Sequence, residues 1–499
     1  MAARGKKPQT SWSPGTDDYR TALVDQNPWW SSGDVPQALA QTQERTLGAN
    51  LFRVMQDGVG RQRFHVVIGP RRVGKTTAMY QTVRHLLAQG VSPRRILWLR
   101  LDHPLLMRVS LGDWVSTYAR HELVTTSEQP TYVFLDELTY AEDWDLWLKT
   151  FYDEAWPVRV VGSSSSTALL RDRHVESGVG RWDEMYLSPY LFPEYLRLIG
   201  NADQISTEST LAETIRANAT DSSSAMAEPL RRYLLTGGFP ELLLRERASD
   251  ADERSRLLES QSTLRSDAVE RVVYKDIPQA YGVDNPMALE RMLYVLAEQA
   301  TGLLSPKNVC ADIQMTTPTF ERYLSYLERA FLVFTLQNYA GSEGTKQRRG
   351  RKLYFVDGAV RNAALHRGLS PLDDQGELGV LRENLVAGHL HALAQLHQTR
   401  LYHWRDGKTE VDLVYDDDLG PLAFEVASSP RHHRGALRDF AERFPRFRGR
   451  CYLVAPGASY EPPHKPLNKP GLISIELLVR CAGAVAERAL RLRLGVDAS

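Results

Sequence analysis

Apolar and polar positions alternate differently in successive stretches of the chain. Between residues 46 and 200, short apolar runs of strand type alternate with helical patterns, which is typical of a parallel α/β sheet. Residues 228–340 have helical periodicity, and from residue 352 onward strands return between helices. The polar segments 1–45 and 201–227 show neither period. The pattern therefore predicts an α/β fold with a helical middle and a second α/β unit towards the C-terminal end.

These changes of pattern set the predicted domain boundaries. The segments are an N-terminal extension at 1–45, a sheet-containing core at 46–200, a helical lid and connector at 201–289, a helix-turn-helix unit at 290–352, a second α/β domain at 353–480 and a basic helical tail at 481–499. A chain of 499 residues is too long for one hydrophobic core, so several domains are expected.

Composition narrows the classes of function. Basic and acidic residues number 61 each, so contact with a nucleic acid would depend on a local basic patch. The three cysteines are isolated, which favours free thiols in a reducing cytoplasm over disulfides or a zinc site. There is no run of about 18 apolar residues, so no membrane span is predicted.

The most informative motif is GPRRVGKT at residues 69–76, between an apolar strand and an amphipathic helix. It fits G-x-x-x-x-G-K-[ST], a loop whose backbone N–H groups hold phosphate oxygens at a helix N-terminus. In such a loop Lys75 reaches the β- and γ-phosphates, and the Thr76 hydroxyl binds Mg²⁺. The predicted nucleotide-contacting residues of the loop are Gly69, Pro70, Arg71, Arg72, Val73, Gly74, Lys75, Thr76 and Thr77.

A second motif, FLDEL, ends another apolar strand with two carboxylates. Asp136 at the strand tip is predicted to hold Mg²⁺ through its water shell. Glu137 is predicted to orient and deprotonate the attacking water. The base-reading motif N-K-x-D of GTPases is absent from the sequence, which favours ATP as the nucleotide.

A third strand, VRVVG, ends in the serine run 163–166. A polar side chain at that tip, Ser163 first, would lie beside the γ-phosphate and sense it. The alternative is a solvated serine turn.

In this order the motifs resemble those of the prokaryotic AAA-type ATP-binding proteins with a C-terminal domain of unknown function. The matching stretches, spread from about residue 50 to 430, are GPRRVGKTT, FLDEL, WLKTFYD, VVGSSSS, GRWDEMYLSPYLFPEY, YLLTGGFPE, VVYKDIP, RYLSYLERAFLV, KLYFVDGAVRNA, ENLVAGHL and YHWRDGKTEVDLVY. The resemblance implies an AAA-like ATPase core at 46–200, then a lid, a winged helix at 290–352 and a restriction-nuclease-like fold at 353–480.

The resemblance also implies two further nucleotide-sensing residues. Arg181, in the sequence GR, would offer its guanidinium to the phosphate of a neighbouring subunit in a homo-oligomer. Pro240, in the sequence GFP, would belong to the lid motif that contacts the nucleotide. The alternatives are a surface ion pair of Arg181 with Asp183 or Glu184, and a simple turn at Gly238–Pro240.

The winged-helix prediction also has support in the residues. Residues 305–329 have helix-turn-helix spacing, with an apolar stripe on the second helix. The glycine-flanked turn that follows is crowded with basic side chains that would reach DNA phosphates if it is a wing. These are Lys346, Arg348, Arg349, Arg351 and Lys352. The alternative is a solvated basic hairpin on a domain that packs against the core.

The last block resembles restriction-type nucleases, but one catalytic group is missing. In active members of that fold an Asp, a Glu and a Lys share one face, where they bind a metal and position water. Here Asp412, Glu425 and Glu383 supply carboxylates, but Ala427 stands where the lysine is expected. The pattern therefore favours a degenerate, inactive site.

Together these features predict a protein that binds and hydrolyses ATP with Mg²⁺. Its winged-helix and degenerate nuclease-like domains would bind a partner, either DNA or protein. An ATP-gated nuclease and a low-turnover regulatory scaffold are the alternatives.

Overall fold

A computed structural model describes residues 16–41, 43–56, 64–121, 130–165, 181–201, 204–220, 223–242, 252–341 and 350–496. Within these ranges the chain forms two five-stranded sheets and a two-stranded hairpin, surrounded by helices. The fold is therefore mixed α/β, which confirms the predicted fold class. None of the helices in the described part of the chain is long and apolar enough to cross a membrane.

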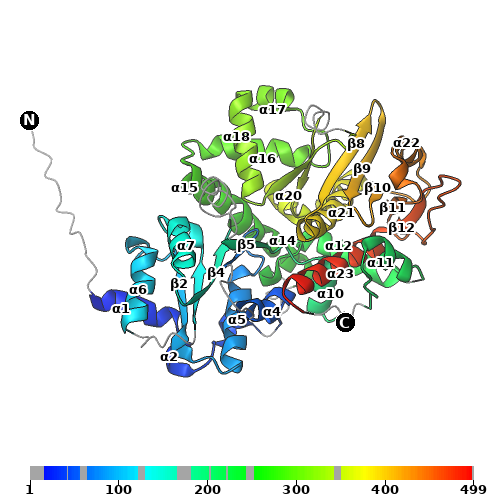
Figure 1. Ribbon diagram of the computed structural model, residues 1–499. Helices are drawn as coiled ribbons and strands as arrows, with labels where there is room; N and C mark the ends of the chain where they lie inside the picture. Colours follow the sequence, from blue (N-terminus) through cyan, green and yellow to red (C-terminus); the bar gives the residue numbers. More distant parts are fainter. Residues whose placement is uncertain are drawn as a thin grey trace, which may run out of the picture.

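The first sheet has the strand order β2-β3-β4-β1-β5, and every neighbouring pair is parallel. Its strands are β1 (Phe64–Ile68), β2 (Ile96–Arg100), β3 (Thr131–Asp136), β4 (Val158–Ser164) and β5 (Trp182–Tyr186), with helices α5 (Lys75–Ala88), α6 (Leu111–His121) and α7 (Trp144–Asp153) in the connections (Figure 1). Because β4 lies between β1 and β3, the C-terminal ends of these three strands converge at one edge of the sheet.

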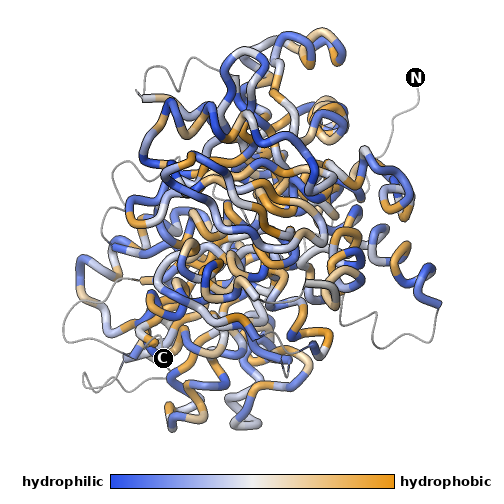
Figure 2. Tube along the Cα trace, turned by 90° about the vertical axis from the view of Figure 1, so that its right-hand side faces the viewer, coloured by the Kyte–Doolittle hydropathy of each residue, from blue (hydrophilic) through white to orange (hydrophobic). Residues whose placement is uncertain are grey.

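Both faces of this sheet are covered. Successive residues of β1 enter different hydrophobic clusters, with Val66 on one face of the sheet and Val67 on the other. β1 and β3 are buried along their whole length, as expected for parallel strands with helices on both sides. Figure 2 shows the apolar stretches of chain gathered in the middle of the molecule.

The N-terminal segment covers the outer edge of the sheet. β2 is an edge strand, and its outward backbone groups at Ile96, Trp98 and Arg100 bond to side chains of residues 26–30. The buried Asn27 amide accepts a hydrogen bond from the Trp98 N–H at 2.7 Å and donates one to the Trp98 carbonyl at 3.0 Å. The indole N–H groups of Trp29 and Trp30 both donate to the Ile96 carbonyl. These side chains replace a neighbouring strand and close the edge to pairing with another chain.

We expect Asn27→Ala to destabilise the protein by about 2 kcal/mol, because the substitution leaves a buried N–H and a buried carbonyl of β2 without partners. The measurement is the urea unfolding transition followed by tryptophan fluorescence. Gln26→Ala is the matched control, since Gln26 also accepts from β2, at Arg100, but at an exposed position where water can replace it. Equal destabilisation by the two substitutions would contradict the edge-cover interpretation.

Helices fill the middle of the chain. They include α12 (Ala227–Thr236), α14 (Glu253–Leu264), α15 (Ile277–Tyr281), α16 (Pro286–Glu298), α17 (Pro306–Ile313) and α18 (Thr317–Arg329). Between α14 and α15 the helix is π-helical at Arg265–Glu270 and Val272–Asp276. In α18 the predicted apolar stripe is buried, at Phe320, Tyr323, Leu324 and Leu327.

After α18 the antiparallel strands β6 (Val333–Leu336) and β7 (Lys352–Phe355) form a hairpin. Leu303, which precedes α17, bridges to Lys352 on the outer side of this hairpin. Two helices followed by a hairpin, with a third strand contact ahead of them, are the elements of a winged helix in the expected order. The assignment of 290–352 as a winged helix is consistent with this order and remains an interpretation.

The second sheet has the order β12-β11-β10-β9-β8 and is mixed. Its strands are β8 (Arg400–Asp406), β9 (Thr409–Asp416), β10 (Leu422–Val426), β11 (Cys451–Ala455) and β12 (Gly471–Ser474), with α20 (Gly358–Ala364) and α21 (Gln375–His397) ahead of the sheet and α22 (Gly435–Arg443) between β10 and β11. β9 and β10 are antiparallel, with Phe424 opposite Leu413. β10, β11 and β12 are parallel.

The C-terminal helix α23 (Ile475–Arg493) returns to the first domain (Figure 1). It packs against α21, α10 (Phe192–Leu198), α11 (Leu211–Ala217) and α4 (Thr46–Gln56). Glu487 of α23 accepts from the Thr46 hydroxyl at 2.6 Å and from Arg197 at 2.7 Å. The predicted start of a basic tail at residue 481 falls inside this largely buried helix, so the segment ties the two sheets together.

Candidate nucleotide-binding site

The phosphate-binding loop joins β1 to α5 and owes its shape to two glycines. Gly69 has a φ of +156°, and a Cβ there would overlap the carbonyl of Leu187 just beyond β5. Gly74 caps α5 in the left-handed region, with φ of +93°. The helix then begins at Lys75, so the positive end of its dipole lies at the loop.

Lys75 is folded back onto this loop. Its Nζ donates to the carbonyls of Gly69 at 2.9 Å and Pro70 at 2.8 Å. Burial lowers the pKa of Lys75 to about 8. A phosphate group entering the loop would compete with these two carbonyls for the ammonium group.

Three strands bring polar side chains together beside Lys75. The Thr76 hydroxyl donates to Asp136 at 3.0 Å, and the Ser163 hydroxyl donates to the same carboxylate at 2.6 Å. Ser163 also accepts from the backbone N–H of Glu137 at 3.0 Å, while the Ser165 hydroxyl donates to the Glu137 carboxylate at 2.7 Å. The serine run therefore does not end in a solvated turn at Ser163, which is fully buried. It positions Asp136, the last residue of β3, and Glu137, which follows it.

The Asp136 carboxylate lacks a full counter-charge. Burial and the neighbouring Glu137 raise its pKa to about 6, although the Ser163 and Thr76 hydroxyls act in the opposite direction. Mg²⁺ prefers oxygen ligands and is often held by one or two protein groups together with phosphate oxygens. The Thr76 hydroxyl and the Asp136 carboxylate form such a pair, so the residues present fit a Mg²⁺ ion.

Glu137 stands at the end of β3 in a strained conformation. Its φ is +55°, in the left-handed region that non-glycine residues seldom adopt. Such strain is frequent at functional sites, where the surroundings enforce it. Here the bonds from Ser163 and Ser165 enforce it, and the carboxylate is directed to the same cavity as Lys75.

This cavity has a volume of about 680 Å³, within the range of about 300–1,000 Å³ that is usual for small-molecule sites. The predicted residues that line it come from the phosphate loop, from the end of β3 and from the lid. Those in the lining are Arg71, Arg72, Gly74, Lys75, Thr76, Thr77, Asp136, Glu137 and Pro240. Gly69, Pro70, Val73 and Ser163 are outside the lining and shape the loop or hold the acidic pair.

The two loop arginines are bound to acidic residues that sequence reasoning did not identify. Arg71 forms a bidentate ion pair with Asp276, with Nη2 at 2.6 Å from Oδ1. Arg72 binds Asp267 at 2.7 Å and also Glu241, which follows Pro240. Asp267 and Asp276 belong to the two π-helical turns. The phosphate loop is therefore tied to the lid by charge.

Arg45 is a further residue that sequence reasoning missed. Its buried guanidinium binds Glu194 at 2.8 Å through both Nε and Nη2, and it lies 4.4 Å from the centre of the Tyr190 ring. Nη1 donates to the carbonyls of Val73 at 3.1 Å and Ser188 at 2.8 Å. Arg45 thereby fixes the phosphate loop to the segment after β5, and no local spacing in the sequence signals this.

Arg181 lies at the start of β5, and its guanidinium binds Asp153 at 2.9 and 3.0 Å. Asp153 ends α7 and was not among the partners considered from the sequence. Gly180 lies outside the described residues. A role of Arg181 towards a neighbouring subunit stays a prediction.

A separate cluster of charges lies in the C-terminal domain and corrects two predictions. Lys352 is 3% exposed, and its Nζ lies 2.9 Å from Glu383, 2.7 Å from Glu410 and 2.7 Å from Asp412. Lys352 was predicted to contact DNA as a wing residue, but its ammonium is enclosed by carboxylates. The cation missing at Ala427 is supplied from β7 instead.

Of the other basic residues predicted for the wing, Arg351 lies within the described part of the chain. Arg351 binds Glu321 at 2.6 Å on the surface of the helical domain. Lys346, Arg348 and Arg349 lie outside the described residues, so the proposed DNA contact rests on their sequence alone.

The carboxylates around Lys352 form an ion cluster. Burial, with Asp412 next in importance, raises the pKa of Glu383 to about 7 and that of Glu425 to about 8. Glu425 Oε1 lies 3.2 Å from His432, and Asp412 Oδ2 accepts from the Val426 N–H at 2.8 Å. All three N–H donors of Lys352 have a carboxylate partner. In the described ranges no set of three or more His, Cys, Asp or Glu side chains is arranged to hold a metal ion.

Because this lysine is already bound by three carboxylates, we expect purified protein not to cleave DNA with Mg²⁺ or Mn²⁺, with or without ATP. The measurement is relaxation of supercoiled plasmid over a range of protein concentrations. Cleavage that persists in Lys75→Ala and disappears in Asp412→Asn would show a working metal site in the C-terminal domain.

Three stretches of the chain match family models of known proteins. Residues 61–196 match a family model described as an AAA domain, and residues 378–465 match a domain of unknown function (DUF4143). Residues 227–371 match another domain of unknown function (DUF8612).

The matching relatives carry no assigned function. An uncharacterized protein of Methanocaldococcus jannaschii is 26% identical over 65% of this chain and 67% of its own length. An uncharacterized protein of Haemophilus influenzae is 23% identical over 60% of this chain and 68% of its own. The Orc1 protein of Aeropyrum pernix in complex with DNA aligns with 65% of this chain and 90% of its own, at 15% identity and a TM-score of 0.29, which is too low to support an argument. The site geometry and the family matches at 61–196 and 378–465 together show that the chain is a P-loop AAA-type protein with a C-terminal domain of unknown function.

Proposed function

We propose that this P-loop protein binds ATP with Mg²⁺ and hydrolyses it, and that hydrolysis switches the arrangement of its lid, winged-helix and C-terminal domains. The observation that carries the proposal is the convergence of Lys75, Thr76, Asp136 and Glu137 on one cavity, with Ser163 binding both acidic residues.

Each of these side chains has a definite task in the proposed reaction. Lys75 would leave the Gly69 and Pro70 carbonyls to bind the β- and γ-phosphates. Mg²⁺, held by Thr76 and by Asp136 through water, would neutralise charge on the phosphates. Glu137 would orient and deprotonate the attacking water, and Ser165 fixes its carboxylate.

The lid would respond through its charges. Arg71 and Arg72 border the cavity, and Asp276, Asp267 and Glu241 bind them from the lid side. Phosphate oxygens compete with carboxylates for guanidinium groups because both accept paired hydrogen bonds. Nucleotide binding would therefore alter the ion pairs that hold the lid to the loop.

The charge cluster of the C-terminal domain is saturated internally, so we assign this domain no catalysis. It would serve instead as a partner-binding surface. The basic residues at 346–351 favour DNA as the partner, and a protein partner is the alternative. A homo-oligomer in which Arg181 reaches a neighbouring phosphate is part of the same proposal.

Two substitutions test turnover. We expect Lys75→Ala to abolish ATP binding in calorimetric titration, since the residue neutralises phosphate charge. Glu137→Gln should keep ATP affinity within about threefold and lower kcat by about 10²-fold or more, because only the base is lost. Equal kcat in wild type and Glu137→Gln would remove Glu137 as the base, and negligible turnover in wild type would favour the scaffold alternative.

A third substitution tests the serine that joins the two acidic residues. We expect Ser163→Ala to lower kcat about tenfold with little change in KM, since Asp136 and the Glu137 backbone lose a shared partner. Ser164→Ala is the matched control, because this buried neighbour points to Thr139 at 3.5 Å and not to the acidic pair. If both variants lose activity equally, the loss reflects damage to β4 and not positioning by Ser163.

A further inference from the structure

The lid turn Gly237–Pro240 is clamped between two parts of the molecule. On one side the Gly238 carbonyl accepts from the Tyr190 N–H at 2.7 Å, just ahead of α10. On the other side the Gly238 N–H donates to the Asp357 carboxylate at 2.8 Å. Gly237 is left-handed with φ of +63°, and a Cβ at either glycine would overlap these neighbours. The two hydrogen bonds of Gly238 and the lack of space for a Cβ at either glycine therefore fix the position of this turn.

At the end of this turn the chain reaches the wall of the nucleotide cavity. Pro240 and Glu241 line it, and Pro240 packs close to Gly74 of the phosphate loop. Glu241 also binds Arg72. The residues that contact the phosphate loop are therefore only two and three positions after Gly238, so a movement of the loop would be passed directly to the lid turn.

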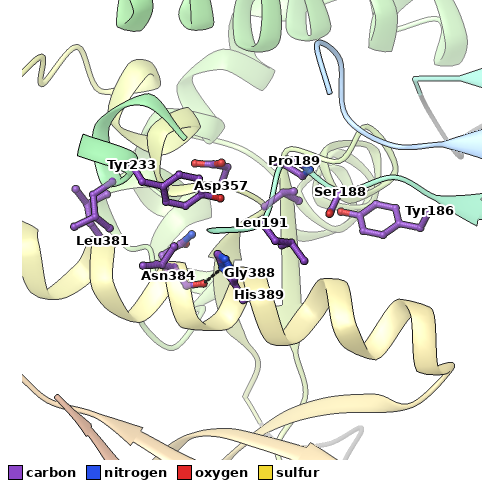
Figure 3. A pocket seen from close by; sticks show the side chains of 14 residues that line it. Tyr186, Ser188, Pro189, Leu191, Tyr233, Asp357, Leu381, Asn384, Gly388 and His389 are labelled. Atoms are coloured by element: carbon purple, nitrogen blue, oxygen red, sulfur yellow. Dashed lines mark hydrogen bonds between the residues drawn. The ribbon is translucent and has the colours of Figure 1, made fainter. Parts of the chain in front are cut away.

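Asp357 is a partly buried carboxylate between the lid turn and helix α20. It follows β7, and its second oxygen accepts from the Ala359 N–H at 2.8 Å and caps α20. Burial raises the pKa of Asp357. Figure 3 shows Asp357 beside Tyr233 of α12, over the helix α21 that carries Asn384 and His389. Within the described residues Asp357 is outside the lining of the nucleotide cavity, and its hydrogen bond to Gly238 joins it to the lid turn.

The segment before Asp357 is β7, and it is attached to α21 along its length. The Tyr354 hydroxyl donates to Glu383 at 2.9 Å. The Asn384 side chain accepts from the Phe355 N–H at 2.8 Å and donates to the Phe355 carbonyl at 2.9 Å. Every residue of β7 is buried. At its first residue, Lys352 binds Asp412 and Glu410 of β9.

We propose that the segment 352–357 is a rigid link between the nucleotide site and the C-terminal sheet. Asp357 is the positioning residue that holds the lid turn, and Lys352 anchors the other end among the carboxylates of β9 and α21. ATP binding displaces the lid turn, and the link transmits the displacement to β9 and β10. The proposal rests on the proposed binding of ATP.

The geometry favours transmission over two independent anchors. The five steps from Lys352 to Asp357 span at most about 17 Å of chain, and its ends are the buried ammonium of Lys352 and the partly buried carboxylate of Asp357, each held by at least two hydrogen bonds. The Lys352 ammonium resists separation from its carboxylates, because an unpaired charge in the interior costs several kcal/mol. A displaced lid turn must therefore either break a buried contact or move the strand that carries it.

The test is hydrogen exchange of the full chain, with and without ATP and Mg²⁺, in the Glu137→Gln background that retains ATP. We expect ATP to change exchange in 409–426 by about threefold or more. In Lys352→Met this response should disappear while ATP affinity stays within about threefold. Arg351→Met is the matched control, since Arg351 is the adjacent residue but binds Glu321 at the surface, and it should respond like the parent.

Glu410→Gln keeps the test decisive if Lys352→Met fails to fold. It removes one of the three carboxylates around Lys352 at the most exposed position, with Glu383 and Asp412 left in place. We expect it to weaken the ATP response of 409–426 at least twofold. An undiminished response in a folded Lys352→Met or, failing that, in Glu410→Gln would overturn the link.

At the other end, Asp357→Asn retains the shape of the side chain but has only one oxygen for the two N–H donors. We expect kcat for ATP to fall about tenfold with the affinity for ATP within about threefold, since the lid turn is misplaced and the loop is intact. Unchanged kcat would overturn the positioning role. A wild type that hydrolyses ATP without any response in 409–426 would overturn the link and leave the proposed function standing, whereas a wild type that does not bind ATP would remove both.

Discussion

One buried carboxylate, Asp136, depends on three strands at once and sets the geometry of the nucleotide site. It accepts hydroxyl bonds from Thr76 after β1 and from Ser163 at the end of β4, while its own strand lies beyond β4. Hydroxyl groups satisfy its hydrogen bonds but supply no counter-charge, and burial together with the neighbouring Glu137 raises its pKa to about 6. The site therefore favours positive charge, which in the proposed function a Mg²⁺ ion beside the phosphates would supply. Lys75, Glu137 and the loop arginines line the same cavity.

The same rule, that buried charge needs a fixed partner, organises the contacts between domains. Arg45 joins the phosphate loop to Glu194, Arg71 joins it to Asp276 on the lid, and Lys352 joins the hairpin to the C-terminal sheet. Breaking any of these pairs would leave an uncompensated buried charge. Helix α23 adds apolar contact between the two sheets. These contacts connect the domains, so a movement of the phosphate loop would also move the residues bound to it in the neighbouring domains.

Much of this could be predicted where the chemistry is local. The phosphate loop needs Gly69 and Gly74 at fixed spacing, and the strand ending in Asp136 and Glu137 is legible from its apolar run. Partners distant in sequence could not be predicted, because no spacing relates Arg45 to Glu194 or Arg71 to Asp276. Lys352 was assigned to a basic wing since it follows three arginines, although the apolar residues after it already place it at the start of a buried strand. The single sequence showed that Ala427 leaves a gap, but not which element fills it.

Binding of a non-hydrolysable ATP analogue to the full chain, measured by calorimetry with Mg²⁺ and then with EDTA, tests the central claim most directly. If Asp136 and Thr76 hold the ion beside the phosphates, Mg²⁺ should strengthen binding at least about tenfold in wild type and have little effect in Asp136→Asn. An affinity that does not depend on Mg²⁺ in wild type, or a dependence that Asp136→Asn leaves unchanged, would contradict the assignment of this cavity as the ATP–Mg²⁺ site.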